Sequence, residues 1–437
     1  MKSYWVEKTT RPSFLNLQED IEADVCIIGA GITGIVTGYM LLETGLKICI
    51  IDKGEICSGV TENTTAKITS QHNLIYSYLI QSFGEEFAKK YFKANEEAID
   101  LIEKIVTKEK IDCEFIRTNN YIYTCKEEYV QKIKDEVNVL ESIGGTPKLV
   151  NKIDLPFEIK IGIEMQNQAQ FHPLKYLYKI AEVLKEYNVQ IYTNSRVQDV
   201  KRDGSYYNVK TENNNIKAKY VVMATHYPIK NFPGLHFLKM YQEKSYEIGI
   251  EPHSKIGTGM YISAETPGAS FRSVKDDILL IGGEKHKTGE TTKNLELCYK
   301  SLGTYAKEIY PSMKTKYRWN TQDCISLDKV AYIGEFSNLM PNFYIATGYN
   351  KWGMTTSHVA AKIISDKISG KENEYAEIYN ATRMEPVKNR KEFGNMLKQT
   401  VYSLGINKLK TPTYKFEDLK KDTRRGSWLW WTKARNI

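Results

Sequence analysis

The sequence predicts an α/β protein in which a domain built on a parallel sheet is interrupted by a smaller, mixed-sheet α+β domain. Near the start, a β-branched run, a glycine-rich turn and an apolar helix follow one another over residues 24–43. Residues 240–320 alternate strand patterns with polar turns, and a second strand, glycine turn and helix follow over residues 343–368. This order indicates two separated halves of one sheet domain with a second domain inserted between them.

Length and charge set the outer limits. The chain has 437 residues, enough for two or three domains with a large core. Its net charge is +8, but residues 420–437 contain six basic groups and one acid and contribute +5 of it. The remaining +3 gives little support to nucleic-acid binding.

The cysteines and the apolar stretches favour a cytoplasmic protein. The seven cysteines form no C-x-x-C pair, and their odd number and scattered spacing favour free thiols in a reducing compartment. The N-terminal residues lack the apolar core of a signal peptide. Residues 23–42 are the most apolar stretch, but their glycines fit a strand, turn and helix better than a membrane span.

The first glycine turn matches the pattern G-x-G-x-x-G in the context that the pattern requires. It connects a strand over residues 24–28 to a helix that ends near Glu43. Its residues are Gly29, Ala30, Gly31, Ile32, Thr33 and Gly34. The first glycine permits a tight turn, the second a close approach to a pyrophosphate, and the third close packing of helix and strand. The free N–H groups at the helix start favour a bound phosphate.

An acid follows at the distance typical of dinucleotide binding. Asp52 ends the second strand, residues 47–52, and Lys53 comes directly after it. A carboxylate there accepts hydrogen bonds from both ribose hydroxyls and disfavours a 2′-phosphate, so NADP is not expected. A glycine-rich turn that binds nothing is the structural alternative, but strand, helix and acid in register favour a bound dinucleotide.

The remaining elements follow in order. Residues 73–144 are largely helical with polar breaks and a strand at 120–125, and a helix covers 172–187. Strands are expected within 189–200, 207–211, 217–225, 244–251, 259–265, 278–284, 330–334 and 343–347, and a last helix over 356–368. We place the sheet domain at 18–100, 145–228 and 323–372, the inserted substrate domain at 101–144 and 229–322, and a helical extension with a basic, Trp-rich tail at 373–437.

The second glycine turn, residues 346–358, bears on which dinucleotide is bound. Gly348 ends a strand, Gly353 permits another close approach of the backbone, and a helix is expected to begin near Thr355. The start of that helix could stabilise charge on a distant part of the same cofactor, which in a reduced flavin lies at N1 and C2=O. An NAD dehydrogenase with one nucleotide domain has no need of this element, whereas an extended FAD does.

Several motifs in this order resemble the FAD-dependent amine and amino-acid oxidoreductases, the family of glycine oxidase, sarcosine oxidase and D-amino-acid dehydrogenase. They cover residues 20–372 and read DVCIIGAGITG, SGVTENTTAK, QFHPLKYL, NSRVQDV, KYVVMAT, DILLIGGE, DKVAYIG and ATGYNKWGMT. TTAKITSQH, QNQAQFHPLKYL, GGEKHKTGE and TGYNKWGMTTSH resemble a bacterial subgroup with a C-terminal Rieske iron–sulfur domain. That domain needs C-x-H and C-x-x-H ligand pairs, which this sequence lacks, so we expect it to be missing.

The resemblance implies a Rossmann-like FAD-binding domain and a set of cofactor-binding residues. The first glycine turn binds the pyrophosphate, and Asp52 binds the adenosine ribose, where the family usually has the longer Glu. Val197 contacts adenine through its backbone. The residues nearest the flavin ring are Thr65, Ala66 and Lys67, and those at its pyrimidine end are Gly348, Gly353, Met354 and Thr355.

Two departures from the family concern substrate and cofactor. The Arg-Pro pair that often follows the tryptophan at Trp319 is absent, so no carboxylate-binding arginine is expected there. Arg272 is another candidate, either for the substrate or for the strand scaffold. Cys324 does not align with the family's flavin-linking cysteine, so non-covalent FAD is expected.

Few side chains are predicted to take part in chemistry. Lys67 would place an ammonium near the reactive edge of the flavin, where it stabilises the anionic reduced ring or guides oxygen; the alternative is a solvated loop lysine. His72, His172, His226 and His286 show no pairing with an acid at family positions, so we assign no general base and expect desolvation to deprotonate the amine. No ligand spacing indicates a metal.

The tail GSWLWWTKAR holds three of the six tryptophans between basic residues. It is either a peripheral membrane contact or a remnant of the iron–sulfur domain of longer relatives, and we favour the remnant.

We therefore expect an FAD-dependent oxidoreductase that oxidises a C–N bond of a small amine or amino acid by hydride transfer to flavin N5. Substrate identity, electron acceptor and oligomeric state have no signal in the sequence. Two alternatives stay open: an NAD-dependent dehydrogenase, and a flavin-binding redox sensor or assembly partner without turnover.

Overall fold

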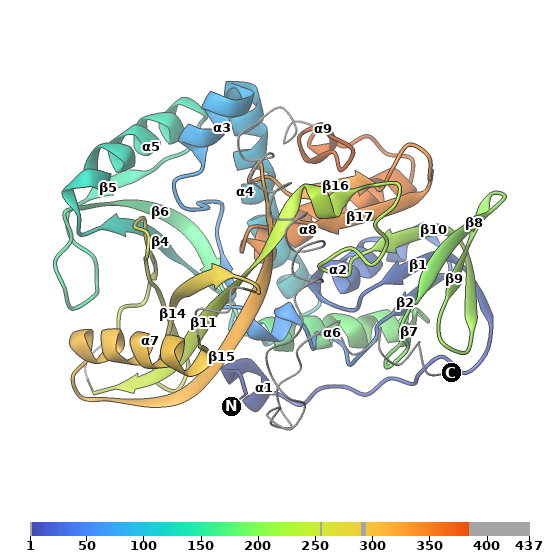
Figure 1. Ribbon diagram of the computed structural model, residues 1–437, viewed down its shortest axis with the longest axis horizontal. Coiled ribbons are helices and arrows are strands. Elements are labelled where there is room, and N and C mark those ends of the chain that lie inside the picture. The colour runs from blue at the N-terminus through green and yellow to red at the C-terminus, as the bar shows by residue number, and fades with distance from the viewer. Residues whose placement is uncertain (1, 254–255, 290–293, 384–437) are drawn as a thin grey trace, which may run out of the picture. The chain divides into compact units, whose positions relative to one another are not determined.

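The computed structural model describes residues 2–253, 256–289 and 294–383. They belong to one compact unit, Met1–Glu385, which contains two sheets (Figure 1). The second unit, Pro386–Ile437, lies outside the described residues, as does the tryptophan-rich tail with its two alternative roles.

The first sheet has the parallel centre expected of a nucleotide-binding domain. Its strand order is β16-β17-β10-β1-β2-β7, with β9 beside β10 and β8 beside β9. The strands are β1 (Ile21–Ile28), β2 (Ile48–Ile51), β7 (Gln190–Tyr192), β8 (Asp199–Asp203), β9 (Tyr206–Lys210), β10 (Asn215–Met223), β16 (Tyr332–Glu335) and β17 (Phe343–Thr347). The pairs from β17 to β7 are parallel, and β16, β9 and β8 join antiparallel. Helices cover a parallel sheet, which explains the nearly continuous apolar runs of β1 and β2.

The second sheet is mixed and follows the order β15-β11-β14-β13-β12-β4-β6-β3, with β5 beside β6. Its strands are β3 (Lys67–Ile68), β4 (Ile116–Thr124), β5 (Lys148–Val150), β6 (Ile161–Gln170), β11 (Met240–Pro252), β12 (Met260–Ser263), β13 (Ser270–Val274), β14 (Ile278–Lys287) and β15 (Met313–Ser326). The predicted α/β class with an inserted mixed sheet is confirmed. The domain boundaries stay a prediction; β3, β5 and β6 belong to the second sheet although they lie in ranges that we assigned to the first domain.

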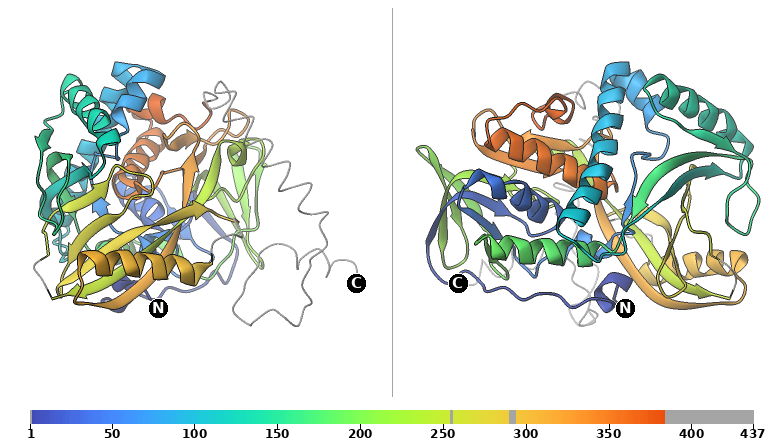
Figure 2. Two further views of the ribbon diagram at one scale, coloured as in Figure 1. Left: turned by 60° about the vertical axis from the view of Figure 1, so that its left-hand side comes forward. Right: turned by 180° about the vertical axis from the view of Figure 1, so that it is seen from behind.

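Helices fill the space around and between the sheets. They are α1 (Tyr4–Glu7), α2 (Ile32–Met40), α3 (Tyr76–Phe83), α4 (Glu85–Lys108), α5 (Val130–Ser142), α6 (Pro173–Glu186), α7 (Leu295–Ile309), α8 (Gly353–Ile368) and α9 (Ala376–Tyr379). Helix α2 contacts α6 and α8, and α4 contacts α8. Seen from behind, α4 stands between the two sheets (Figure 2). In the described part of the chain, no helix combines the length and apolar character that crossing a bilayer requires.

Local sequence explains where the helices near the cavity begin and end. The helix predicted to reach Glu43 ends at Met40, because Leu42–Thr44 tighten into a 3-10 turn before Gly45, whose φ is +71°. Helix α6 begins with a His172 side chain that accepts the N–H of Lys175 and with Pro173 in its first turn. The helix predicted to begin near Thr355 begins at Gly353.

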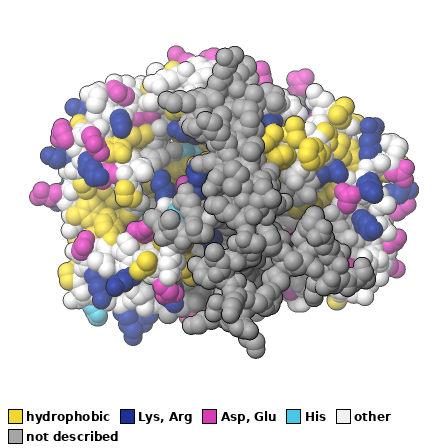
Figure 3. Space-filling view, viewed as in Figure 1, with side chains coloured by type: hydrophobic (Ala, Val, Ile, Leu, Met, Phe, Trp, Pro, Cys, Tyr) yellow, Lys and Arg dark blue, Asp and Glu magenta, His cyan; other side chains and the backbone are white. Residues whose placement is uncertain are grey.

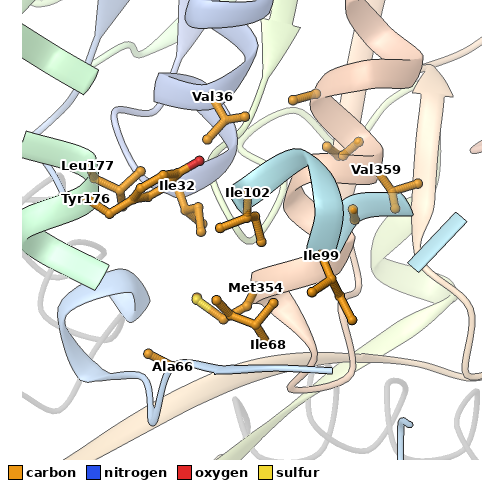
Figure 4. Packing of buried hydrophobic residues seen from close by; sticks show 14 of the residues in the cluster. Ile32, Val36, Ala66, Ile68, Ile99, Ile102, Tyr176, Leu177, Met354 and Val359 are labelled. Atoms are coloured by element: carbon orange, nitrogen blue, oxygen red, sulfur yellow. The ribbon is translucent and has the colours of Figure 1, made fainter. Parts of the chain in front are cut away.

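The main core extends from these helices to the loop before β3. Ile32 and Val36 of α2, Ile99 and Ile102 of α4, and Val359 of α8 pack in one cluster with Ala66, Ile68 and Met354 (Figure 4). The loop that we expect beside the flavin is therefore anchored in the core on its inner side.

The surface carries mixed charge. On the face drawn in Figure 3, acidic and basic side chains are interspersed over the described surface.

All seven cysteines are unpaired, and six of them are buried.

Candidate functional site

A cavity of about 940 Å³ is lined by both sheets and by both glycine turns. Its volume is at the upper end of the range for ligand sites in proteins. The predicted residues that line it are Gly29, Gly31, Ile32, Thr33, Asp52, Lys53, Thr65, Lys67, Val197, Gly348, Gly353 and Met354. The predicted residues outside its lining are Ala30, Gly34, Ala66, Thr355 and Arg272.

The first glycine turn has the close packing that its pattern predicts. Gly29 has a φ of +112°, and a Cβ added there would lie 2.4 Å from the carbonyl oxygen of Ala224, which directly follows the neighbouring strand β10. A Cβ on Gly34 would lie 1.8 Å from the carbonyl oxygen of Gly29. Larger side chains therefore cannot occupy either position without moving the backbone, and helix α2 starts directly at the cavity wall.

Asp52 is bound to the backbone of the same turn. One carboxylate oxygen accepts the N–H of Ala30 at 2.7 Å, and the other accepts the N–H of Gly54 at 2.9 Å. A carboxylate has about four acceptor positions, so both oxygens can still accept hydroxyl groups. Although Asp52 is shorter than the Glu that is usual in the family, its carboxylate reaches the glycine turn and lies at the cavity wall.

The two glycine turns meet. The hydroxyl groups of Thr33 and Tyr349 lie 2.9 Å apart, although 316 residues separate them in sequence. Gly348 has a φ of +73°, which turns the chain between β17 and α8. Beside them the ring of Trp352 stacks on His72 at 4.7 Å between centroids. Two patterns far apart in sequence therefore form one wall of the cavity.

The loop before β3 is fixed by hydrogen bonds to five consecutive carbonyl groups. The donors are Ser3 to Glu62, Trp319 to Asn63, Trp5 to Thr64, and Arg272 to both Thr65 and Ala66. Ala66 has a φ of +53°, an unfavourable backbone conformation for alanine. Each of these carbonyls therefore has a hydrogen-bond partner outside the loop.

Arg272 is buried behind this loop. Besides the two loop carbonyls, its guanidinium donates to the carbonyl of Phe171 and to the side chain of Gln170, and it lies over the ring of Trp5. These contacts favour the scaffold alternative for Arg272. A substrate role stays an untested prediction.

Lys67 and Glu247 place opposite charges at the second sheet. The ammonium of Lys67 donates to Ser270 Oγ at 3.1 Å, and burial lowers the pKa of Lys67 to about 8. Glu247 of β11 lines the same cavity, and burial raises the pKa of its carboxyl to about 7 in spite of Lys67. Our sequence reasoning missed Glu247. The sequence signal was weak. Glu247 is an acid between Tyr246 and Ile248 in an expected strand, so its side chain points to the opposite face of the sheet from those two.

Burial opposes protonation of the buried histidines, and several of them form hydrogen bonds within the protein. Burial lowers the pKa of His72 and His172 to about 3, and that of His358 to about 4. His72 bonds Tyr91 and contacts the hydroxyl of Thr355 at 3.2 Å. His226 lines the cavity, and its Nε2 lies 2.7 Å from the carbonyl oxygen of Gln322.

Comparisons with known proteins agree with this geometry. The chain is 36% identical over 421 residues to YhfW of Bacillus subtilis (strain 168), named as a Rieske 2Fe-2S iron–sulfur protein, covering 96% of this chain and 82% of that protein. It is 20% identical over 381 residues to gamma-glutamylputrescine oxidoreductase of Escherichia coli (strain K12), covering 82% and 86% of the two chains. Its fold is similar to the crystal structure of glycine oxidase from Geobacillus kaustophilus, with a TM-score of 0.72, 17% identity, and coverage of 83% and 99%. The model of the family described as FAD dependent oxidoreductase matches residues 24–367, and the chain therefore belongs to that family.

Proposed function

We propose that this FAD-dependent oxidoreductase oxidises a C–N bond of a small amine or amino acid. The observation that carries the proposal is the cavity itself, which is lined by both glycine turns and by polar side chains of the second sheet. The names of similar proteins, glycine oxidase and gamma-glutamylputrescine oxidoreductase, support an amine or amino-acid substrate. Membership of an FAD family sets aside the NAD-dependent dehydrogenase.

The residues present fit FAD. The tight turn that Gly29 and Gly34 permit and the start of α2 at the cavity wall suit a diphosphate, and Asp52 retains acceptor positions for ribose hydroxyls. The first turn of α8, with Gly353 and Met354 on the cavity wall, offers N–H groups to a second electron-rich part of the cofactor. When bound, FAD supplies the two-electron acceptor of the reaction. We propose that it is held without a covalent bond.

We propose that the loop before β3 and the second sheet position the substrate beside the cofactor. The loop before β3 presents Lys67 from a fixed backbone, and the second sheet lines the cavity with Glu247, Ser270 and Thr321. Desolvation strengthens every charge interaction at this wall.

An anaerobic titration of the purified, FAD-loaded chain with a panel of amines and amino acids tests the proposal. We expect at least one compound to bleach the visible absorbance of the flavin, because substrate oxidation reduces it. If no compound of the panel bleaches the flavin while dithionite does, the protein is better described by our alternative of a flavin-binding redox sensor or assembly partner. A cytoplasmic location, supported by seven unpaired cysteines, remains part of the proposal.

A further inference from the structure

A row of residues runs across the second sheet beneath the cavity. Ser270 of β13 lies opposite Gly282 of β14, Gly282 opposite Glu247 of β11, and Glu247 opposite Trp319 of β15. Residues directly opposite each other point to the same face of a sheet. Ser270 and Glu247 therefore face the cavity from either side of a glycine.

Gly282 makes room for the carboxylate of Glu247. A Cβ added to Gly282 would lie 2.2 Å from Glu247 Oε2 and 2.9 Å from the carboxyl carbon. The carboxylate thus lies on the backbone of the neighbouring strand and extends towards Ser270, which holds the ammonium of Lys67. Because Gly282 has no side chain, the carboxylate of Glu247 can occupy this place.

One oxygen of this acid is without a partner. Glu247 is 6% exposed, and its Oε2 accepts no hydrogen bond from the residues that the structure describes. A buried carboxylate oxygen without a donor is costly, so such groups in a cavity usually await a ligand, an ion or water. Thr321, on the same wall, also has a buried hydroxyl oxygen with no described partner.

The charges around Glu247 leave it available for a cation. The ammonium of Lys67 attracts the carboxylate of Glu247, but the two form no salt bridge. Lys351, a second cation nearby, is bound to Glu243 at 2.7 Å. Asp323 influences the titration of Glu247, and Glu247 influences that of Tyr299. Burial also raises the pKa of Asp323, to about 6. The wall thus contains two buried acids, of which Glu247 has an unoccupied acceptor oxygen.

We propose that Glu247 is the cation-binding group and proton acceptor of the cavity, so that the substrate enters as a protonated amine that donates an N–H to the carboxylate of Glu247. This inference rests on the proposed amine oxidation. In the proton step, one N–H bond of the ammonium breaks and an O–H bond forms on Glu247, with no oxidation or reduction. The product of the step is a neutral amine, whose nitrogen lone pair is then available when the C–N bond is oxidised.

Binding of an unreactive cation tests the proposal without turnover. The probe is tert-butylammonium chloride, which has no hydrogen on the carbon that bears nitrogen, and the readout is its perturbation of the visible flavin spectrum in the FAD-loaded chain. We expect saturable binding that tightens as the pH rises through about 7, where Glu247 becomes ionised. Glu247→Gln should weaken binding about ten-fold or more and flatten this pH dependence, since hydrogen bonds to charged groups are worth a few kcal/mol.

Three controls separate charge from shape. The uncharged analogue tert-butanol should bind the Glu247→Gln variant and the unchanged chain equally. Glu251→Gln removes an acid from the same strand that is paired with Lys316 outside the cavity lining, and should leave probe affinity unchanged. Gly282→Ala should weaken the ammonium probe independently, because its Cβ displaces the carboxylate.

The outcomes distinguish this inference from the proposed function. No binding of the ammonium probe to the unchanged chain, equal affinity in Glu247→Gln, or equal loss of both probes would overturn the role of Glu247. If amines bleach the flavin and Glu247→Gln still binds the cation normally, the oxidation proposal stands and this inference fails. If the cation binds through Glu247 and no amine bleaches the flavin, the cation-binding role of Glu247 stands and the oxidation proposal fails.

Discussion

Individual residues in the cavity differ in how far the sequence could identify them. Asp52 and the glycines at 29 and 34 follow from spacing, because their roles are set by a local strand–turn–helix pattern. Glu247 does not, because its role depends on Gly282 and Ser270 on neighbouring strands of the sheet. Cross-strand register is a property of the folded sheet and leaves no mark in a short stretch of sequence.

Replacing Lys67 with Met tests the charge that Lys67 places at the cavity wall. Methionine is unbranched and one atom shorter than lysine, and it lacks the ammonium and its bond to Ser270. We expect flavin reduction or reoxidation to slow by about ten-fold or more, because a preorganised charge contact is typically worth a few kcal/mol. Stopped-flow absorbance measures both half-reactions. Lys104→Met on the exposed face of α4 is the control, and unchanged half-reaction rates in Lys67→Met would refute the role.

Among the elements, the two glycine turns were predictable and the support of the loop before β3 was not. Each turn is a short pattern of strand, glycine and helix. The loop depends on donors from α1 and its N-cap Ser3, from β13 and from β15, and the bond from Trp319 spans 256 residues. Nothing within residues 59–67 indicates which distant side chains bind its carbonyl groups. Helix α1 lies before the first residue matched by the family model, yet both Ser3 and Trp5 support this loop.

Helix α1 should therefore contribute to FAD affinity. Trp5→Phe retains an aromatic ring but loses the hydrogen bond to Thr64, which is worth about 1 kcal/mol. Trp5→Ala also leaves a hole where a fully buried ring stood, at about 3–5 kcal/mol of stability. We expect the dissociation constant of FAD, followed by flavin fluorescence, to rise in that order. Leu15→Ala changes a side chain that is 79% exposed and should have no effect. Equal FAD affinity in all the variants would show that the loop does not need α1.

At the scale of the whole described unit, the sheet order brings the cofactor-binding elements together. Strands β1, β10 and β17 are adjacent and parallel, so the turns that follow them meet at one edge of the sheet. The sequence allowed this inference because one extended cofactor requires both turns. It could not supply the cavity's opposite wall, since the strands of the second sheet come from residues 67–68, 116–170 and 240–326 and combine only in the fold.

The same burial that shapes the cavity predicts how stability depends on pH. His72 and His172 have pKa values lowered to about 3, and His236 and His358 to about 4, so below their ordinary pKa of about 6.5 the unfolded chain binds more protons than the folded one. Stability present above about pH 6.5 is therefore lost as the pH falls towards about 4. Glu247 and Asp323 act in the opposite direction, because their raised pKa values let the folded state bind protons first. Asp52, Glu62 and Glu136, whose pKa values burial also raises, act in the same direction as these two acids.

Taken together, the pKa values of these four histidines lie further from their ordinary value than those of Glu247 and Asp323 lie from theirs, so we expect the thermal unfolding midpoint of the FAD-loaded chain to decrease on acidification from about pH 6.5. Calorimetry or circular dichroism over a pH series measures this. His358→Gln should be less stable overall, because it perturbs the contacts of His358 with Tyr176 and Met354, but its midpoint should fall less steeply with pH. A midpoint that rises on acidification, or an unchanged slope in His358→Gln, would mean that these histidines are protonated in the folded protein and that their surroundings stabilise the charge.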